Sequence, residues 1–511
     1  MKPTNTLVLL LIIVVIGTGL RFLGLNHVPP HLSNDEISIA YDAYSLSLTG
    51  RDEHNHPLPL SFQSHNTYKA PLYAYLLSPL THIFGNTNVV AKLPSALLGS
   101  LTILVFFFIT YLLTKNRRLS LLSCLVLAIS PWHINISHSV LESNVALFFL
   151  SLGIVYLLRE KSFFSALFLS LSVYGYHTEW GLVPALAISA YFLVFRKKSA
   201  GKFFLALTFV FCLPLFINYL HLSAANTRAS SEVIWNDPQI QTPLKIVQVF
   251  VSNYFSYNNP GYLFFSGLGL FNNHIHPYQF GLFLWPLILP FFIGLSKIKD
   301  TVSKKFFWFF IIWILSSPIV PSLTSNSNIL IRNLPAVLPY SMLISFGMYW
   351  LLKSHKQMFS LVLFLSFAFL ALFLPVYIFH FPIETASTYQ GYMPIAAYLK
   401  SHSGQFTSVR IDDRFGVDNQ FIGVPHLYFA YYNRFDPKTI QNRLYLKDAT
   451  YYGNYAVTWI DWSKIRVDPN TWYVVGIGNH PSPEIQIKLK FIAGFPDAGG
   501  RPAFEIWTGR N

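Results

Sequence analysis

Charged residues are scarce in this chain of 511 residues: Asp, Glu, Lys and Arg together make up 11% of it. Soluble domains carry about 25% of such residues. Apolar side chains take their place, since 53% of the residues are hydrophobic and 17% are aromatic. The composition excludes an ordinary soluble protein and indicates a polytopic membrane protein.

Cysteine and the usual ligand-binding motifs are also rare or missing. The two cysteines, Cys124 and Cys212, both lie in apolar runs, which argues against a disulfide framework. The sequence has no Gly-rich phosphate loop and no clear Asp-x-Asp element, so a nucleotide-sugar donor is not indicated. His274 and His276 stand two residues apart, but no third ligand is apparent and no metal site is predicted. No cofactor is firmly implied, and a divalent cation is left open.

Eleven stretches approach the roughly 20 apolar residues that a membrane-spanning helix needs. They are 5–24, 88–113, 119–135, 143–158, 162–178, 180–195, 203–221, 280–296, 306–321, 333–352 and 358–379. Several are short or interrupted, which leaves ten or twelve spans open. The first is interpreted as a retained helix, because Gly17-Thr18-Gly19 is a weak candidate for signal-peptide cleavage.

Basic residues cluster in alternate connections between these stretches. The clusters fall at 115–118, 159–161, 196–198, 297–305 and 353–356. Under the positive-inside rule these connections are cytoplasmic. A net charge of +14 would otherwise suggest nucleic acid, but this distribution argues against such a partner. We therefore expect a multi-pass plasma-membrane protein with a cytoplasmic N-terminus and an extracytoplasmic C-terminus.

Two domains are predicted from the distribution of apolar residues. Residues 1–379 would form a transmembrane domain, whose long external loop, 25–87, lies between the first two helices. Residues 380–511 have the mixed charges of a soluble domain, with strand-like residues at 472–477 and helix-like residues at 393–399. The expected architecture is a helical membrane domain followed by a small extracytoplasmic α/β domain.

The external loop contains an acidic pair, Asn34-Asp35-Glu36. One interpretation is structural: Ser33 or Asn34 caps a helix whose first turn holds both acids. The other is functional, because carboxylates close to a membrane are costly and often belong to a site. A carboxylate can accept the proton of an attacking hydroxyl group. From these residues alone the two interpretations stand level.

The surrounding residues resemble a known catalytic loop. Arg21, Pro29-Pro30, Asp35-Glu36, Tyr41-Asp42-Ala43-Tyr44 and Thr49-Gly50-Arg51-Asp52 follow one another as in the first external loop of family 39-type glycosyltransferases. This GT-C superfamily includes protein O-mannosyltransferases and lipid A aminoarabinose transferases. The resemblance implies a GT-C fold with about eleven transmembrane helices.

Four further stretches extend this resemblance. They are 68–73, with Ala70 in place of a proline, 130–144, 174–180 and 325–339. A fifth stretch, 253–282, keeps the family pattern only in part, because Leu268 stands where an aspartate is expected.

The resemblance implies roles for particular residues. The catalytic residues would be Asp35, as the base, and Glu36, which supports it. Arg332 and Lys69 would bind the donor phosphate, a task that suits guanidinium because it is always charged and binds phosphate oxygens in pairs. The other substrate-binding residues would be Arg51, His138, Glu142, Tyr176 and His177. The structural alternative for Lys69 and Arg332 is snorkelling to the membrane interface.

The implied reaction moves a sugar, mannose-like or related, from a polyprenyl-phosphate-linked donor to an acceptor hydroxyl outside the membrane, with inversion. Protein, lipid and other envelope-glycan acceptors stay open. The alternative from another class is a transporter or flippase of lipid-linked sugars, although such proteins often show internal repeats and broken helices at the membrane midplane. The polar residues of this chain instead gather in external loops, which favours chemistry there.

Overall fold

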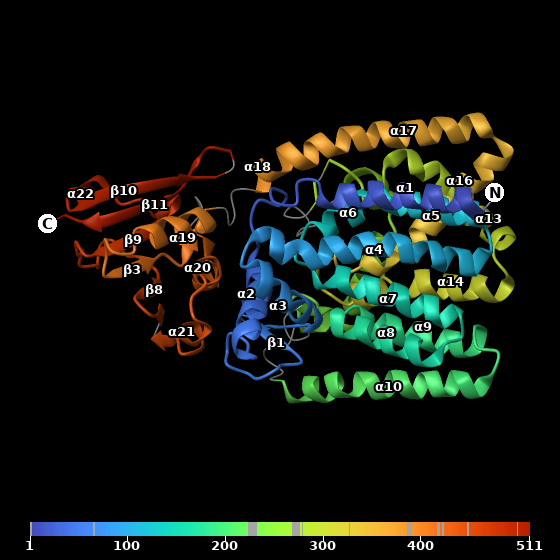
Figure 1. Ribbon diagram of the computed structural model, residues 1–511, viewed down its shortest axis with the longest axis horizontal. Coiled ribbons are helices and arrows are strands. Elements are labelled where there is room, and N and C mark those ends of the chain that lie inside the picture. Colours follow the sequence, from blue (N-terminus) through green and yellow to red (C-terminus); the bar gives the residue numbers. More distant parts are fainter. Residues whose placement is uncertain are drawn as a thin grey trace. The chain divides into compact units, whose positions relative to one another are not determined.

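The computed structural model describes residues 3–64, 67–222, 232–267, 276–277, 279–326, 328–385, 391–415, 420–421, 424–446, 449–497 and 499–510. Its chain divides into two compact units. The first, called the helical unit, comprises Met1–Leu25, Asn66–Tyr73 and Lys92–Tyr377. The second, called the sheet unit, comprises Asn26–His65, Ala74–Ala91 and Ile378–Asn511. Figure 1 shows the elements of both.

The helical unit is built almost entirely of helices. Its α-helices are α1 (Pro3–Phe22), α4 (Asn88–Thr114), α5 (Arg117–Ala128), α6 (Pro131–Ser137), α7 (Glu142–Leu158), α8 (Ser162–Gly175), α9 (Glu179–Leu193), α10 (Lys198–His221), α12 (Pro243–Tyr257), α13 (Ile288–Thr301), α14 (Lys304–Ser316), α15 (Ile319–Ser322), α16 (Val337–Ser354) and α17 (Lys356–Pro375). Shorter elements are β2 (Thr67–Lys69), η2 (Ile234–Asn236), η3 (Tyr262–Ser266), η5 (Trp285–Leu287), η6 (Leu334–Ala336) and η7 (Val376–His380). Each of the eleven stretches predicted from apolar runs falls wholly or largely on these helices.

The helices meet the requirements for membrane crossing to different degrees. Within the described residues, six are long and apolar enough to span a membrane, and α5 with α6 make a seventh if this pair, bent by 59°, is one span. Three more apolar helices, α7, α8 and α9, have 10–17 residues. The protein is therefore a multi-span membrane protein, and the number eleven stays a prediction.

The bend between α5 and α6 has a local cause in the sequence. Pro131 starts α6, where its missing N–H is tolerated, but the preceding residues cannot continue α5 through it. The carbonyls of Leu127 and Ala128 at the end of α5 then need donors, and Arg21 of α1 supplies them at 3.2 Å each. Arg21 is fully buried. This arginine of the predicted loop motif thus fastens α1 to α5.

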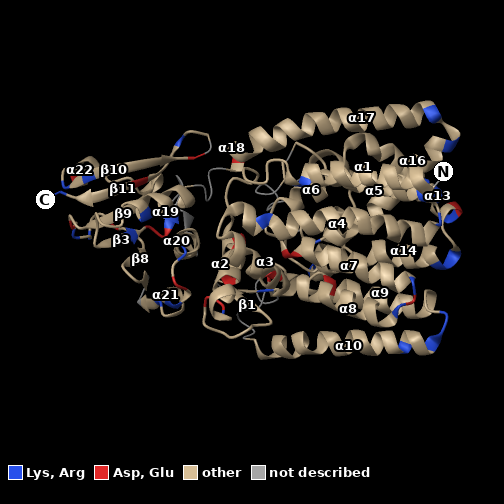
Figure 2. Ribbon diagram, viewed as in Figure 1, with Lys and Arg blue, Asp and Glu red and all other residues tan. Residues whose placement is uncertain are grey.

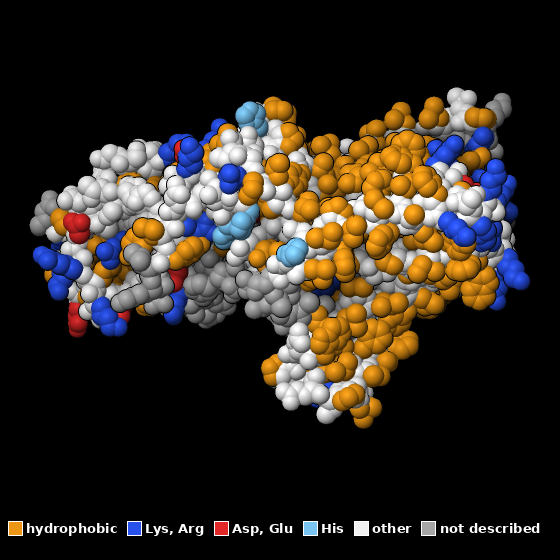
Figure 3. Space-filling model, turned by 90° about the horizontal axis from the view of Figure 1, so that it is seen from below, with side chains coloured by type: hydrophobic (Ala, Val, Ile, Leu, Met, Phe, Trp, Pro, Cys, Tyr) orange, Lys and Arg blue, Asp and Glu red, His pale blue; other side chains and the backbone are white. Residues whose placement is uncertain are grey.

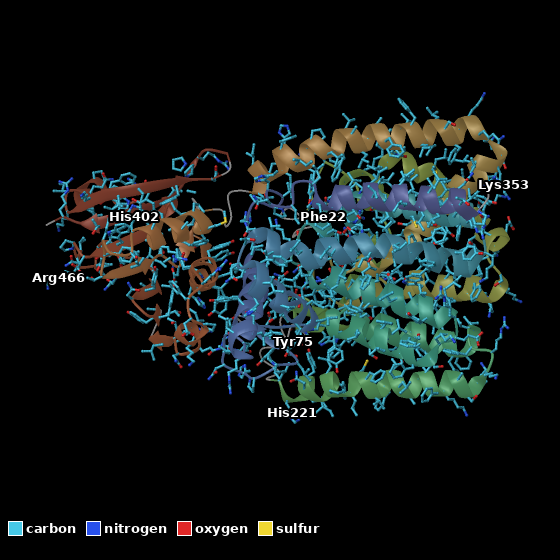
Figure 4. The ribbon with its side chains drawn as sticks, in the orientation of Figure 1. Phe22, Tyr75, His221, Lys353, His402 and Arg466 are labelled. Atoms are coloured by element: carbon cyan, nitrogen blue, oxygen red, sulfur yellow. The ribbon has the colours of Figure 1, made fainter. Side chains whose placement is uncertain are left out.

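Lys and Arg gather at one end of the helical unit, the end where the N-terminus lies (Figure 2). Lys353 marks that end, whereas Phe22 and His221 mark the opposite end (Figure 4). Between the ends, hydrophobic side chains cover most of the visible face of the unit (Figure 3). The predicted alternation of basic connections is consistent with this arrangement, and the side of the membrane that each end faces stays a prediction.

The sheet unit combines the external loop with the C-terminal region. Its helices are α2 (Asn34–Thr49), most of α3 (Leu72–Phe84), α18 (Phe381–Thr385), α19 (Tyr392–Ser401), α20 (Pro425–Asn433), α21 (Pro437–Gln441), η8 (Ile477–Asn479) and α22 (Pro483–Gln486). Its strands are β1 (Phe62–Ser64), β3 (Ser408–Ile411), β4 (Arg414–Phe415), β5 (Gln420–Phe421), β6 (Leu444–Leu446), β7 (Ala449–Tyr452), β8 (Tyr455–Thr458), β9 (Thr471–Gly476), β10 (Leu489–Pro496) and β11 (Pro502–Gly509).

Seven of these strands form one mixed sheet in the order β10-β11-β9-β3-β8-β7-β6. β3 is parallel to both β8 and β9, and the other pairs are antiparallel. All six residues of β9 are buried, as its continuous apolar sequence predicts. Trp472 packs against Tyr398 of α19, while Tyr473 and Val475 join the core on the other face. The predicted C-terminal α/β domain, with a strand near 472–477 and a helix near 393–399, is confirmed.

The division into units differs from the predicted domains in one respect. Residues 26–65 and 74–91 pack with 378–511, whereas the sequence places both ranges in the transmembrane domain. The physical reason is that α2 packs on α20 and hydrogen-bonds to the segment that follows it. Tyr75 of α3 adds a contact within the same unit, since its hydroxyl donates to the Pro59 carbonyl at 3.0 Å (Figure 4).

Candidate functional site

The acidic pair Asp35-Glu36 occupies the first turn of α2. Ser33 is the N-cap, and its backbone N–H donates to Glu36 Oε2 at 2.8 Å while the Glu36 N–H donates to Ser33 Oγ at 3.4 Å. This is a capping box, so the structural interpretation of Glu36 has a geometric basis. Glu36 is buried, whereas Asp35 is exposed. The two carboxylates therefore differ in surroundings, and the catalytic role of Asp35 stays a prediction.

The loop after α2 is held in shape by its own polar groups. Gly50 has a positive φ of 67° and ends the helix. Asp52 Oδ1 then accepts the N–H groups of His54 and His56 at 2.9 and 2.8 Å. Arg51 is exposed and donates to the Asn55 carbonyl at 2.9 Å. Arg51 thus contributes to the turn, and its contact with substrate stays a prediction.

Lys69 and Glu142 come together within the helical unit. Lys69 ends β2 and is only 2% exposed. The next residue, Ala70, donates its N–H to Glu142 Oε1 at 2.8 Å. Glu142 starts α7 and is 9% exposed, so its carboxylate holds the segment that carries Lys69. Glu142 therefore acts on the position of Lys69 in this structure, and sugar contact by Glu142 stays a prediction.

His138, a third predicted contact residue, is fully buried. Its Nδ1 lies 3.0 Å from the carbonyl oxygen of Ile134, and its Nε2 lies 3.1 Å from that of Leu23. The ring also packs edge-on against Tyr377, with 5.3 Å between centroids. These contacts join the end of α1 to α6. The structure thus gives His138 a packing role, and its contact with substrate stays a prediction.

Arg332, Tyr176 and His177 line one cavity of 280 Å³. Tyr176 and His177 lie between α8 and α9, and Arg332 precedes η6. The cavity also reaches Tyr219, close to the end of α10 at His221, and therefore lies at the end of the helical unit away from its basic connections. The structure thus brings Arg332 close to the consecutive residues Tyr176 and His177, which lie far from it in the sequence. Their contact with substrate stays a prediction.

Arg332 is bound at the wall of this cavity by three polar contacts. Its Nη2 lies 2.5 Å from Glu232 Oε2, and its Nη1 donates to Thr324 Oγ1 at 2.7 Å. Its backbone carbonyl accepts the Thr178 hydroxyl at 2.9 Å. The Arg332 side chain is 12% exposed and that of Glu232 is 31% exposed. A guanidinium that already holds an anionic oxygen in a partly open cavity is arranged to bind an anion.

An apolar groove adjoins the cavity. It has a volume of 360 Å³, and Trp180 lines both spaces. Its walls are α8, α9 and α10, and its lining residues include Val183, Pro184, Phe209 and Phe216. Such a groove suits a hydrocarbon chain, because apolar side chains offer it dispersion contacts and no polar group to leave unpaired.

Glu232 and Trp180 are members of this site that the sequence interpretation missed. Glu232 follows a polar stretch with no periodic pattern, and its partner lies 100 residues further along the chain, so no local signal identifies it. Trp180 adjoins the Tyr176-His177 pair and stacks on His177 at 6.0 Å between centroids. The sequence signal for Trp180 was its position three residues after His177, across the start of α9, which allows the two rings to stack.

The nine predicted residues fall into four groups. Asp35, Glu36 and Arg51 belong to the sheet unit, whereas the other six belong to the helical unit. Of these six, Arg332, Tyr176 and His177 share the cavity, Lys69 and Glu142 are joined through Ala70, and His138 packs under Leu23.

Among the described residues, no set of three His, Cys, Asp or Glu side chains is arranged to hold a metal ion. His276 Nε2 lies 2.7 Å from the Phe280 carbonyl oxygen. His274 and Leu268 lie outside the described residues.

The fold and site together define a multi-span membrane protein with an arginine-containing cavity beside an apolar groove. Residues 68–221 match the family model for dolichyl-phosphate-mannose-protein mannosyltransferase. A comparison of the sequence with curated proteins gave no match.

Solved structures share the fold over nearly the whole chain. ArnT from Cupriavidus metallidurans bound to undecaprenyl phosphate has a TM-score of 0.57 at 13% identity, covering 99% of this chain and 98% of that one. Its apo state gives 0.55 at 12% identity over the same shares. An Archaeoglobus fulgidus oligosaccharyltransferase tethered with an acceptor peptide containing the NVT sequon gives 0.50 at 12% identity, covering 84% and 63%. The predicted resemblance in fold to GT-C membrane glycosyltransferases is thereby confirmed.

Proposed function

We propose that the protein transfers a sugar from a polyprenyl-phosphate-linked donor to an acceptor hydroxyl group. One observation carries the proposal: the cavity that contains Arg332 adjoins a long apolar groove. A lipid phosphate has the same two parts, an anionic head and a hydrocarbon tail. In the proposal, Arg332 binds the phosphate and the groove between α9 and α10 takes the first part of the tail.

The chemistry follows from the charges that the reaction creates. Asp35 takes the proton of the acceptor hydroxyl while the hydroxyl oxygen attacks the anomeric carbon. The bond from this carbon to the phosphate oxygen breaks, and its electron pair leaves with the polyprenyl phosphate. Attack opposite the leaving group inverts the anomeric centre. Arg332 and Lys69 stabilise the negative charge that builds on the phosphate, which is the usual electrostatic route to a lower barrier.

Two features support this assignment over a purely structural one. Arg332 is mostly buried and bonded to another side chain at a cavity, whereas a snorkelling arginine extends its head into water. Asp35 is exposed although the adjacent carboxylate, Glu36, is engaged in capping.

The comparisons are consistent with the donor class and leave the sugar open. One structure that shares the fold holds undecaprenyl phosphate, and another is tethered to an acceptor peptide. We propose a lipid-phosphate donor here, with the acceptor drawn from protein, lipid or envelope glycan. The same proposal puts the basic end of the helical unit in the cytoplasm and the sheet unit outside.

Replacing Asp35 with asparagine tests the proposal. General bases contribute roughly 10²- to 10⁴-fold to rate, so Asp35→Asn is expected to lower transfer by that factor. The measurement is sugar transfer by purified protein from polyprenyl-phosphate mannose to peptide, lipid A and glycan acceptors. Asp300→Asn is the matched control, because Asp300 is an exposed acid on α13 at the basic end.

Near-normal turnover by Asp35→Asn would show that Asp35 is not the catalytic base. Movement of the lipid-linked sugar across liposomes without transfer by the native protein would instead favour the transporter.

A further inference from the structure

The C-terminal region of the sheet unit contacts α2 and its flanking residues at both ends of the helix and along its length. At the first end, the Tyr428 hydroxyl of α20 donates to the Leu32 carbonyl at 2.7 Å. The same hydroxyl lies 3.5 Å from Asn34 Oδ1. These two acceptors lie three residues and one residue before Asp35. A side chain nearly 400 residues away in sequence thus fixes the backbone and side chain next to the proposed base.

A second contact point lies along and beyond the helix. The Tyr44 hydroxyl donates to the Phe435 carbonyl at 3.1 Å. Gln441 Nε2 donates to Ser45 Oγ at 3.2 Å and to the Asp52 carbonyl at 3.1 Å. The same amide donates to Thr49 Oγ1 at 3.2 Å, one turn further along α2. Because one amide group joins two turns of helix and the following loop, rotation of α2 about its axis is opposed.

The third contact point is a buried ionic cluster at the loop after α2. Arg443 Nη1 donates to the Glu53 backbone carbonyl at 2.6 Å, and its Nη2 lies 3.4 Å from Glu53 Oε2. His426 Nε2 lies 3.9 Å from the same carboxylate oxygen. Burial opposes ionisation of Glu53, but the contacts with His426 and Arg443 outweigh it and lower the pKa of Glu53 to about 2. The Glu53 carboxylate is therefore charged and held.

Tyr428 is itself rigid, which matters for a residue that sets a position. It is 1% exposed, and its ring stacks on Tyr392 at 4.7 Å between centroids. The ring therefore has little freedom, and its hydroxyl offers a fixed donor. In contrast to Gln441 and Arg443, Tyr428 contacts the end of α2 that carries Asp35.

We propose that Tyr428 is a positioning residue for the catalytic base Asp35, acting through the Leu32 carbonyl and Asn34. The inference rests on the proposed function, because it assumes that Asp35 is the base. A base works only within hydrogen-bonding reach of the proton it removes, and a 1 Å displacement is able to cost about 10²-fold in rate. The C-terminal domain is thereby part of the catalytic apparatus.

The test is Tyr428→Phe, which keeps the ring packing and removes only the hydroxyl. Tyr431→Phe is the matched control: this tyrosine is also fully buried on α20, and its hydroxyl also donates to a backbone carbonyl, that of Thr87, at 3.4 Å. Transfer is measured with polyprenyl-phosphate mannose as the varied substrate, and thermal unfolding is followed in the same detergent. Tyr428→Phe is expected to lower kcat about tenfold, with KM for the donor unchanged. Tyr431→Phe is expected to keep the native kcat.

Equal kcat values for the two variants would overturn the positioning role, as would a loss in Tyr428→Phe that appears entirely in KM. If Tyr428→Phe gives too little folded protein, Asn34→Ala replaces it, because it removes an acceptor of the same hydroxyl and leaves α20 intact. Asn34→Ala is also expected to lower kcat, and a native kcat in that variant would overturn the inference.

Asp35→Asn separates this result from the proposed function. If that variant is inactive while Tyr428→Phe and Asn34→Ala are normal, only the positioning role fails. If Asp35→Asn is active, the base assignment in the proposed function fails, and the positioning role that rests on it fails as well.

Discussion

Each unit of the protein contains an arginine–glutamate pair, and the two pairs differ in almost every physical respect. In the helical unit, Arg332 and Glu232 are 12% and 31% exposed and border a cavity. In the sheet unit, the Arg443 and Glu53 side chains are 4% and 2% exposed. Arg443 also bonds to the Glu53 main chain, and His426 joins the pair.

The difference shows how the same two residue types serve two purposes. A buried pair with several hydrogen bonds fixes a loop, because separating it would leave a charge without water or partner. A partly exposed pair contributes little to stability and exchanges readily with other ions. In the first case the glutamate is a structural partner, and in the second, under the proposed function, it occupies the place of the donor phosphate. Three substitutions test this contrast.

The largest effect on stability is expected from Glu53→Gln. Removing one partner of a buried ion pair costs about 3–5 kcal/mol, since the other charge stays buried. The sheet unit should therefore unfold at a clearly lower temperature, measured by thermal unfolding in detergent. Glu484→Gln, an exposed acid on α22, is the control and should leave the transition unchanged.

Acid sensitivity sharpens the same test. The pKa of Glu53 in the folded protein, about 2, lies below its ordinary value of 4.5. The stability that this carboxylate contributes is therefore complete above pH 4.5 and is lost as the pH falls from 4.5 towards 2. Glu53→Gln should lack this part of the acid dependence. An unaltered acid profile in the variant would contradict the role given to the pair.

An intermediate effect, on binding, is expected from Arg332→Ala. Hydrogen bonds to charged groups contribute about 1.5–3 kcal/mol, which corresponds to a roughly 10- to 150-fold loss of affinity. Binding of polyprenyl phosphate to the purified protein measures it. The affinity of Arg332→Lys for polyprenyl phosphate should fall between that of the native protein and that of Arg332→Ala, because lysine keeps the charge and loses the paired geometry. Arg196→Ala, at the basic end, serves as the control. Equal losses of affinity in Arg332→Ala and Arg196→Ala would argue against a phosphate site at Arg332.

The smallest effect, and one of opposite sign, is expected from Glu232→Gln. If the carboxylate occupies the position of the phosphate, its neutral isostere competes less and donor binding becomes tighter. Surface pairs are worth about 0–1 kcal/mol and this pair is partly buried, so a gain of about fivefold is expected. Glu160→Gln breaks an exposed pair with Arg196 and should change nothing. Weaker binding in Glu232→Gln would show that Glu232 contacts the donor directly.

The sequence was informative where the relevant pattern was local. Apolar runs located the helices, and the continuous apolar stretch of β9 located a central strand. The polar turn at Tyr176-His177 and the arginine before a proline-rich helix were both recognised, and they meet in one cavity. The capping box was also readable, because Ser33 and Glu36 are three residues apart.

What the sequence left undetermined depends on distant partners. Nothing near Glu232 indicates that it faces Arg332, and nothing near Tyr428 indicates that its hydroxyl faces Leu32. The external loop was therefore assigned to the transmembrane domain, although hydrogen bonds from α20, α21 and Arg443 place it in the sheet unit. Such contacts depend on the tertiary fold rather than on spacing along the chain.

The bond between Tyr428 and Leu32 also constrains the order of events during synthesis, because its two residues are 396 positions apart. At about 5–20 residues per second, roughly 20–80 s pass between the making of the acidic loop and the making of its anchor. During that interval α2 lacks the hydroxyl that fixes its first turn. Under the proposed function, a growing chain thus has its acidic pair long before the base is positioned, and catalytic competence arrives only with the last fifth of the polypeptide.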